Sequence, residues 1–117
     1  NHWQSGVALG KLRDTGILST PDSLYRDRRV QSLLAPHRGR ITRGHVKGAL
    51  FDRFADPWSV CRPPRLNTRG VATATTAMIL MQPGEGHLEA CPMPSLNKRF
   101  TTYSLTPDRT AQRQAAD

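Results

Sequence analysis

The sequence has few of the residues that stabilise small proteins, and it has no long apolar run. Only 6% of the 117 residues are aromatic, and the two cysteines, Cys61 and Cys91, form no CxxC pair. Neither a zinc site nor a disulfide framework is indicated. The four histidines lack HxxxH or HExxH spacing, so we predict no metal and no cofactor. The longest apolar run, Ala77 to Met81, is far shorter than the roughly 20 residues that cross a bilayer. We therefore expect a soluble chain with no membrane partner, located in the cytoplasm.

The chain also lacks a recognisable start. It begins Asn1-His2-Trp3, without a methionine and without the basic and apolar segments of a signal peptide. We therefore expect the C-terminal part of a larger protein, whose function belongs to the whole. Apolar residues make up 37% of the chain, and nine prolines and nine glycines interrupt it. This composition predicts one domain with a thin core.

Positive charge is in excess and unevenly distributed. The net charge is +8, and residues 1–70 contain 13 Lys and Arg against 5 Asp and Glu, whereas residues 71–117 contain four of each. Many of the cations cluster at Arg26, Arg28, Arg29, Arg38, Arg40, Arg43 and Lys47. Such a stripe is typical of nucleic-acid binding or of phosphorylated cofactors, and also of a solvated helix face or a surface that meets an acidic segment. Aromatic residues do not alternate with the cations, so nucleic acid is the weaker interpretation.

The apolar pattern predicts two helices in the first half, after a loop over residues 5–19. The first begins at Thr20-Pro21-Asp22, with a hydroxyl cap, a proline at the first helical position and an acid in the first turn, and ends near Leu34. The second runs from about Thr42 to Pro57. We expect Arg26 and Arg29 to pair with acids such as Asp22. Apolar faces are expected from Leu24, Tyr25, Val30, Leu33 and Leu34, and from Val46, Ala49, Leu50, Phe51 and Phe54.

The second half predicts antiparallel strands. Residues 58–69 are irregular, and Pro63-Pro64 excludes a helix there. Strands are expected from Gly70 to Met81, from His87 to Cys91 after a turn over residues 82–86, and from Arg99 to Leu105. Two helices followed by about three antiparallel strands make an α+β fold over residues 1–105, followed by a polar tail over residues 106–117. The exposed sheet edges predict a partner from another segment.

Several stretches in collinear order carry a family resemblance. They are Asn1-His2, Asp22-Ser23-x-x-Arg26-x-x-Arg29 leading into Leu33-Leu34, Trp58-Ser59-Val60-Cys61-Arg62 and Thr68-Arg69-Gly70-Val71-Ala72-Thr73. Over residues 1 to about 105, the chain resembles the C-terminal portion of the acyl-coenzyme A:6-aminopenicillanic acid acyltransferase family. These are cysteine N-terminal-nucleophile (Ntn) hydrolases, related more distantly to choloylglycine hydrolase. The resemblance implies a four-layer αββα sandwich made by autoproteolysis, in which the new N-terminal Cys attacks an amide or thioester and its own amine is the base.

The resemblance also assigns roles to three residues. Asn1 falls on a donor to the oxyanion, and Arg69 falls on an arginine near the nucleophile that can hold an acidic side chain or a substrate carboxylate. Thr68 precedes it as a substrate-binding hydroxyl. The alternatives are a disordered terminal Asn1 and a surface Arg69. The chain departs from the family in having no N-terminal Cys, and Cys61 is expected in the core.

We therefore expect the C-terminal segment of an autoprocessed Ntn-type acyltransferase or amidohydrolase, inactive alone, with its cysteine nucleophile upstream. Its partners would be the upstream segment of the same precursor and a small-molecule amide or thioester, with acyl-CoA as a possible donor. The basic first half would face that segment or the phosphates of the donor. Two alternatives stay open: a basic RNA- or ribonucleoprotein-binding module, and an interaction fragment without chemistry of its own.

Overall fold

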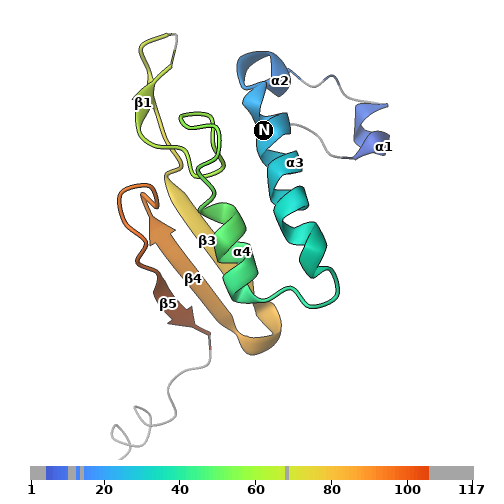
Figure 1. Cartoon of the computed structure of the whole chain (residues 1–117), viewed down its shortest axis with the longest axis vertical. Helices are drawn as coiled ribbons and strands as arrows, with labels where there is room; N and C mark the ends of the chain where they lie inside the picture. Colours follow the sequence, from blue (N-terminus) through green and yellow to red (C-terminus); the bar gives the residue numbers. More distant parts are fainter. Residues whose placement is uncertain (1–4, 11–12, 14, 68, 106–117) are drawn as a thin grey trace, which may run out of the picture.

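The computed structural model describes residues 5–10, 13, 15–67 and 69–105. Helices come first along the chain, and antiparallel strands follow (Figure 1). The two longer helices are α3 (Asp22–Leu34) and α4 (Arg43–Leu50). The strands are β1 (Arg65–Leu66), β2 (Ala72–Thr73), β3 (Ala77–Gln82), β4 (His87–Pro92) and β5 (Thr101–Ser104). Helices and antiparallel strands are segregated along the chain, and the predicted α+β class is confirmed.

The segment before α3 is more regular than the predicted loop. It contains two single-turn helices, α1 (Gly6–Leu9) and α2 (Gly16–Ser19). The backbone N–H and the hydroxyl of Thr20 both donate to the Gly16 carbonyl, each at 2.9 Å. Thr20 therefore closes α2, and α3 begins after Pro21 without a side-chain cap. Within the described ranges, no helix has the length and apolar character needed to cross a membrane.

The two longer helices form where the sequence predicts them, but α4 is shorter than expected. Thr42 caps α4: its hydroxyl accepts the His45 N–H, while the His45 ring accepts the Thr42 N–H. The helix ends at Leu50 rather than at Pro57, because the chain folds back and the Cys61 N–H donates to the Asp52 carbonyl at 3.0 Å. Phe54, predicted on the apolar face, is consequently 65% exposed.

The main sheet has the order β3-β4-β5, with both pairs antiparallel. The predicted hairpin is confirmed: β3 and β4 pair from Ala77–Pro92 to Gln82–His87. The turn between them is a 3-10 turn that ends at Gly86, whose φ of +65° favours glycine. The strand predicted from Gly70 to Met81 is split, because residues 72–73 turn away to pair with β1.

The core lies between one face of this sheet and the helices. It is built on Met78, Cys61 and Cys91, with Leu50, Phe51 and Phe100 packed against it. The predicted core position of Cys61 is confirmed, because its exposure is 1%. On the other sheet face, the side chains of Ile79, Met81 and Tyr103 remain 55%, 67% and 56% exposed. Among the described residues the sheet is therefore covered on one side only, and its open side exposes these three large side chains.

Candidate anion-binding site

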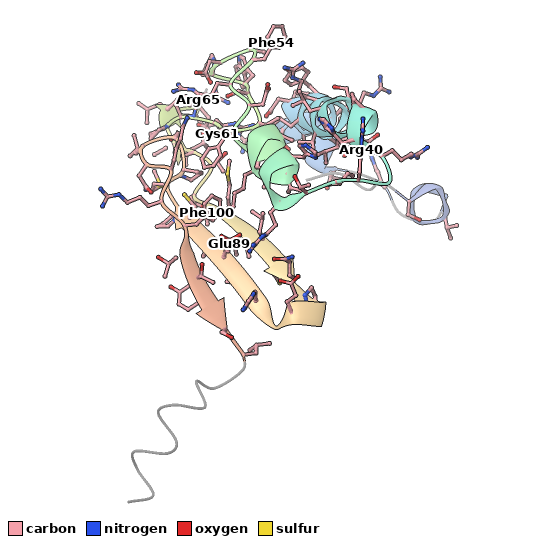
Figure 2. The ribbon with its side chains drawn as sticks, turned by 60° about the horizontal axis from the view of Figure 1, so that its bottom comes forward. Arg40, Phe54, Cys61, Arg65, Glu89 and Phe100 are labelled. Atoms are coloured by element: carbon pink, nitrogen blue, oxygen red, sulfur yellow. The ribbon has the colours of Figure 1, made fainter. Side chains whose placement is uncertain are left out.

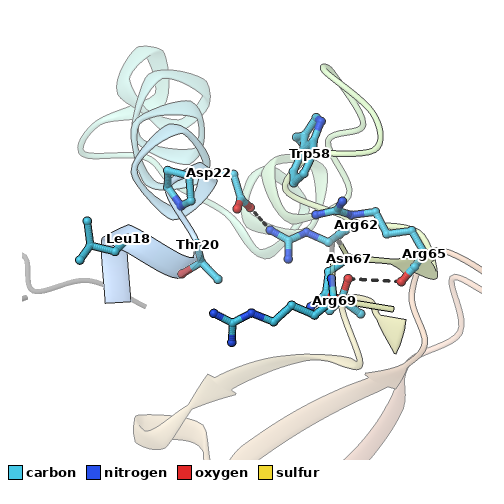
Figure 3. Close-up of a pocket in the computed structure, with 10 residues that line it drawn as sticks. Leu18, Thr20, Asp22, Trp58, Arg62, Arg65, Asn67 and Arg69 are labelled. Carbon is cyan, nitrogen blue, oxygen red and sulfur yellow. Dashed lines mark hydrogen bonds and ion pairs between the residues drawn. The ribbon is translucent and has the colours of Figure 1, made fainter. Parts of the chain in front are cut away.

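A pocket of about 420 Å³ lies between the start of α3 and the β1–β2 ribbon (Figure 3). One wall is formed by residues 18–22 at the α2–α3 junction. The other is formed by lining residues between Trp58 and Thr73, a stretch that includes β1 and β2. The lining residues are Leu18, Thr20, Pro21, Asp22, Trp58, Arg62, Arg65, Asn67, Arg69 and Thr73. Three of them are arginines, which we call the pocket cations, and only Asp22 is acidic. The pocket is therefore positively charged.

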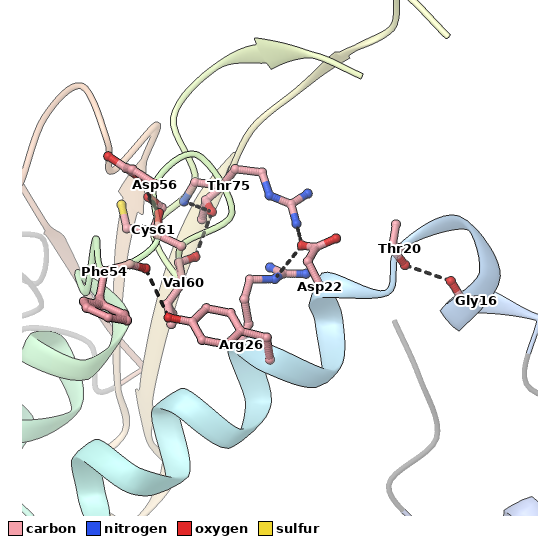
Figure 4. Close-up of polar contacts among 12 residues, drawn as sticks. Gly16, Thr20, Asp22, Arg26, Phe54, Asp56, Val60, Cys61 and Thr75 are labelled. Carbon is pink, nitrogen blue, oxygen red and sulfur yellow. Dashed lines mark hydrogen bonds and ion pairs between the residues drawn. The ribbon is translucent and has the colours of Figure 1, made fainter. Parts of the chain in front are cut away.

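Arg62 is the most deeply buried pocket cation, and Asp22 holds it in an ion pair (Figure 3). Its overall exposure is 8%. The Nε of Arg26, one helical turn along α3, lies 3.3 Å from the same carboxylate in a second ion pair, which confirms the predicted pairing of these two residues (Figure 4). Burial lowers the pKa of Arg62, helped by the nearby charge of Arg65, and burial also lowers the pKa of Arg26. A guanidinium still stays charged at neutral pH, so one carboxylate balances two cations.

Thr75 fixes the backbone on which Arg62 is carried. Its hydroxyl accepts the Arg62 N–H at 2.9 Å and donates to the Val60 carbonyl at 3.2 Å, and its own N–H donates to the Arg62 carbonyl. These bonds tie the two sides of the segment together, so the Arg62 side chain starts from a rigid point. A threonine suits this position, because its hydroxyl can donate and accept at once.

Arg65 is held by an aromatic ring instead of an acid. Its guanidinium carbon lies 3.6 Å from the centre of the Trp58 ring, a cation–π contact. The Nε atoms of Arg62 and Arg65 are buried and have no hydrogen-bond acceptor among the described residues. Buried N–H groups are usually satisfied in proteins. Neither atom is accessible to solvent, so both donors stay unsatisfied among the described residues.

Arg69, the site arginine predicted from the sequence, lines the same pocket. The side-chain oxygen of Asn67 accepts the N–H groups of Arg69 and Val71, each at 2.9 Å, and so fixes the turn between β1 and β2. From this turn the Arg69 side chain extends toward the α2–α3 wall (Figure 3). Neither Arg65 nor Arg69 pairs with a carboxylate in the described part of the chain. Both guanidiniums are therefore available to a ligand.

The other predicted site residues, Asn1 and Thr68, lie outside the described residues. Cys61 and Cys91 do not line the pocket and are 1% and 0% exposed. Burial raises the pKa of the Cys61 thiol, which disfavours its reactive thiolate form. The described lining contains no thiol and no imidazole. This arrangement suits the binding of a carboxylate or phosphate.

Sequence reasoning missed most of this site. Asp22, Trp58, Arg62 and Arg65 were not predicted to line it, although the concentration of arginines over residues 62–69 after a tryptophan was a usable signal. The prediction for Arg29 needs correction. It makes a two-pronged ion pair with Asp52, with contacts of 2.7 and 3.1 Å, because the chain after α4 brings that carboxylate against α3.

Comparisons with known proteins add no relative. Neither protein-family models, curated proteins nor solved structures give a match to this chain. Among the described residues, no group of three or more His, Cys, Asp or Glu side chains could hold a metal ion. The case for a function therefore depends on the geometry of the pocket and on the sequence pattern.

Proposed function

We propose that this chain is the C-terminal segment of an autoprocessed Ntn-type acyltransferase or amidohydrolase, and that its pocket binds the anionic group of the substrate. The observation that carries the proposal is the position of Arg69. The residue that the family resemblance assigns to the site lies beside Arg62 and Arg65, in a pocket large enough for a small molecule. Three guanidiniums around one pocket suit an anionic group of a substrate.

The chemistry divides between two segments. The upstream segment supplies an N-terminal Cys, whose own amine takes the proton of the thiol, so that the thiolate attacks the carbonyl carbon of an amide or thioester. The amine or thiol leaves with that proton, and water or an acceptor amine then releases the acyl group. The described residues of this chain do not react: Arg69 and Arg65 hold a carboxylate by paired N–H donors and so position the carbonyl. Asn1 is the proposed donor to the oxyanion.

The open sheet face supports the αββα part of the proposal. The side chains of Ile79, Met81 and Tyr103 project from it, and neighbouring positions of the same face hold Leu88 and Ala90, opposite Tyr103 and Ile79. None of these residues is charged. A monomer rarely exposes so continuous an apolar surface without a partner. A second sheet from the upstream segment would cover it at the usual spacing of about 10 Å between stacked sheets.

The pocket can be tested with this chain alone. Acetate, as a simple carboxylate, is titrated while the fluorescence of Trp58 is followed in a Trp3→Phe background. Arg69→Gln should weaken binding about tenfold or more, because it removes charge-assisted hydrogen bonds. Arg99→Gln removes an exposed cation outside the pocket lining and is the matched control. Equal affinities in the two variants would show that the carboxylate is not bound by Arg69.

The enzymatic part needs the companion segment. Intact-mass measurement of the purified material should reveal a second polypeptide that begins with Cys. In the reassembled enzyme, Arg69→Lys should lower kcat/KM about tenfold to a hundredfold, because one ammonium cannot replace a two-pronged guanidinium. The absence of any companion polypeptide, or an unchanged kcat/KM of Arg69→Lys in the reassembled enzyme, would overturn the assignment.

A further inference from the structure

The turn between α3 and α4 carries a second concentration of positive charge, far along the helix from the pocket. Its arginines are Arg38, Arg40 and Arg43, which we call the turn cations. No Asp or Glu occurs between residues 28 and 51. Arg38 and Arg40 are exposed and make no ion pair with any described residue. Arg43 is 52% exposed at its side chain and has only a 3.9 Å contact with Glu89.

The backbone holds Arg38 and Arg40 in a defined turn. Gly39, between them, has a φ of +80°, a conformation that residues with a Cβ rarely adopt. The Arg40 N–H donates to the His37 carbonyl at 2.9 Å, and the Arg38 N–H donates to the Ala35 carbonyl at 3.2 Å. Gly39 therefore allows a tight turn with Arg38 on one side of it and Arg40 on the other.

Side chains brace the same turn against α4. The rings of His37 and His45 stack with their centres 3.7 Å apart and their planes 13° from parallel. His45 is also the residue that exchanges hydrogen bonds with Thr42 at the start of α4. The cap and the stack stabilise the start of α4. They also hold the turn in one conformation, so that less conformational entropy is lost when a partner binds.

We propose that this turn is a docking site for an acidic polypeptide segment. Carboxylates match the guanidiniums of Arg38 and Arg40 in charge and in geometry. Ile41, 49% exposed between Arg40 and Arg43, offers an apolar contact that a polypeptide can use. Residues 35–50 contain no Phe, Tyr or Trp on which bases of a single-stranded RNA could stack. Figure 2 shows Arg40 at the connection of the two helices, whereas the pocket lies at the start of α3. The turn is therefore a separate surface from the pocket.

The test measures binding of fluorescent poly-L-glutamate to the whole chain by anisotropy, at low ionic strength. Arg38→Gln with Arg40→Gln should weaken binding about threefold to tenfold, since each exposed charge pair is worth a fraction of a kcal/mol. The matched control, Lys98→Gln with Arg99→Gln, removes the same charge at exposed positions outside the turn. It should change binding by much less than the turn variant.

A third variant separates geometry from charge. Gly39→Ala keeps every cation, and open space surrounds the site of the added methyl, but it strains the positive φ. It should weaken binding of poly-L-glutamate without changing the net charge. Equal losses in the two charge variants, with no effect of Gly39→Ala, would show diffuse attraction and overturn the proposal. Tighter binding of charge-matched polyuridylate, lost in the turn variant, would overturn it in favour of RNA.

Discussion

Two of the pocket cations, Arg62 and Arg65, are held differently from Arg38 and Arg40, whereas the pocket cation Arg69 is itself exposed and has no ion pair with a described residue. Arg62 is 8% exposed and is paired with Asp22, and Arg65 lies against the Trp58 ring. Arg38 and Arg40, in contrast, are exposed and have no ion pair with a described residue. The same type of side chain is thus buried at one end of α3 and an exposed charge without an ion pair at the other. The net charge alone does not distinguish the two.

The difference comes from how far apart in the sequence the contacting residues lie. The pocket joins Asp22 with Arg62, forty residues further along the chain, so it exists only in the folded state. The turn is held by contacts between residues at most eight apart, such as His37 and His45. We therefore expect substitutions in the pocket to affect stability, and substitutions in the turn to affect binding only.

The largest effect should follow from Asp22→Asn. The change leaves the buried Arg62 and its neighbour Arg26 without their shared carboxylate, and breaking a buried pair in this way costs about 3–5 kcal/mol. Urea unfolding should show this as a fall in the midpoint. Arg53→Gln, which removes a pair with Asp56 that is exposed on both sides, should cost far less.

A second variant keeps this prediction testable if Asp22→Asn does not fold. Asp22→Asn combined with Arg62→Met removes both charges and should recover part of the lost stability. Recovery would show that the unpaired buried guanidinium was the cause. An Asp22→Asn variant as stable as the parent would remove the distinction between the two ends of α3.

A smaller effect on stability is expected from the ion pair between Lys47 of α4 and Glu89 of β4. The Lys47 Nζ lies 2.8 Å from Glu89, and this hydrogen bond keeps the pKa of Glu89 below its usual value, against a smaller opposing effect of burial. A carboxyl with a lowered folded-state pKa stabilises the fold above its unfolded pKa, roughly 4.3, and the stabilisation is lost as the pH falls through the folded value.

Thermal unfolding from about pH 7 to about pH 3 checks this effect. The parent should lose stability on acidification, and Glu89→Gln should lose less, since it has no carboxyl to protonate at this position. The comparison is made in an Asp56→Asn background, because hydrogen bonds from Ser59 and Arg53 also lower the pKa of Asp56. Identical pH profiles with and without Glu89 would contradict the prediction.

The smallest effect should come from the turn. Arg38→Gln and Arg40→Gln remove exposed side chains without ion pairs in the described structure, so each should change the free energy of unfolding by less than about 0.5 kcal/mol. The same urea titration measures it. A loss of about 2 kcal/mol or more would show that these arginines are structural, as in the pocket.

Local patterns predicted the helix over residues 22–34 and the β3–β4 hairpin. Both are set by nearby residues: Pro21 and Pro36 bound the helix, and the turn from Gln82 to Gly86 reverses the chain. The end of α4 was not predictable in this way. It depends on Asp52 accepting the Cys61 N–H and pairing with Arg29, contacts that a window of sequence around the helix does not contain.

In the candidate site, too, only the features set by nearby residues were predictable from the sequence. The pattern Thr68-Arg69-Gly70 pointed to Arg69, which lines the pocket, but nothing local to Arg69 indicated Asp22 or Trp58. By itself the sequence determined the α+β order, the turn cations and the excess of charge in the first half, because these depend on composition and short-range spacing. Only the tertiary structure decided which arginines are buried and paired. That choice depends on which distant segments exclude water around them.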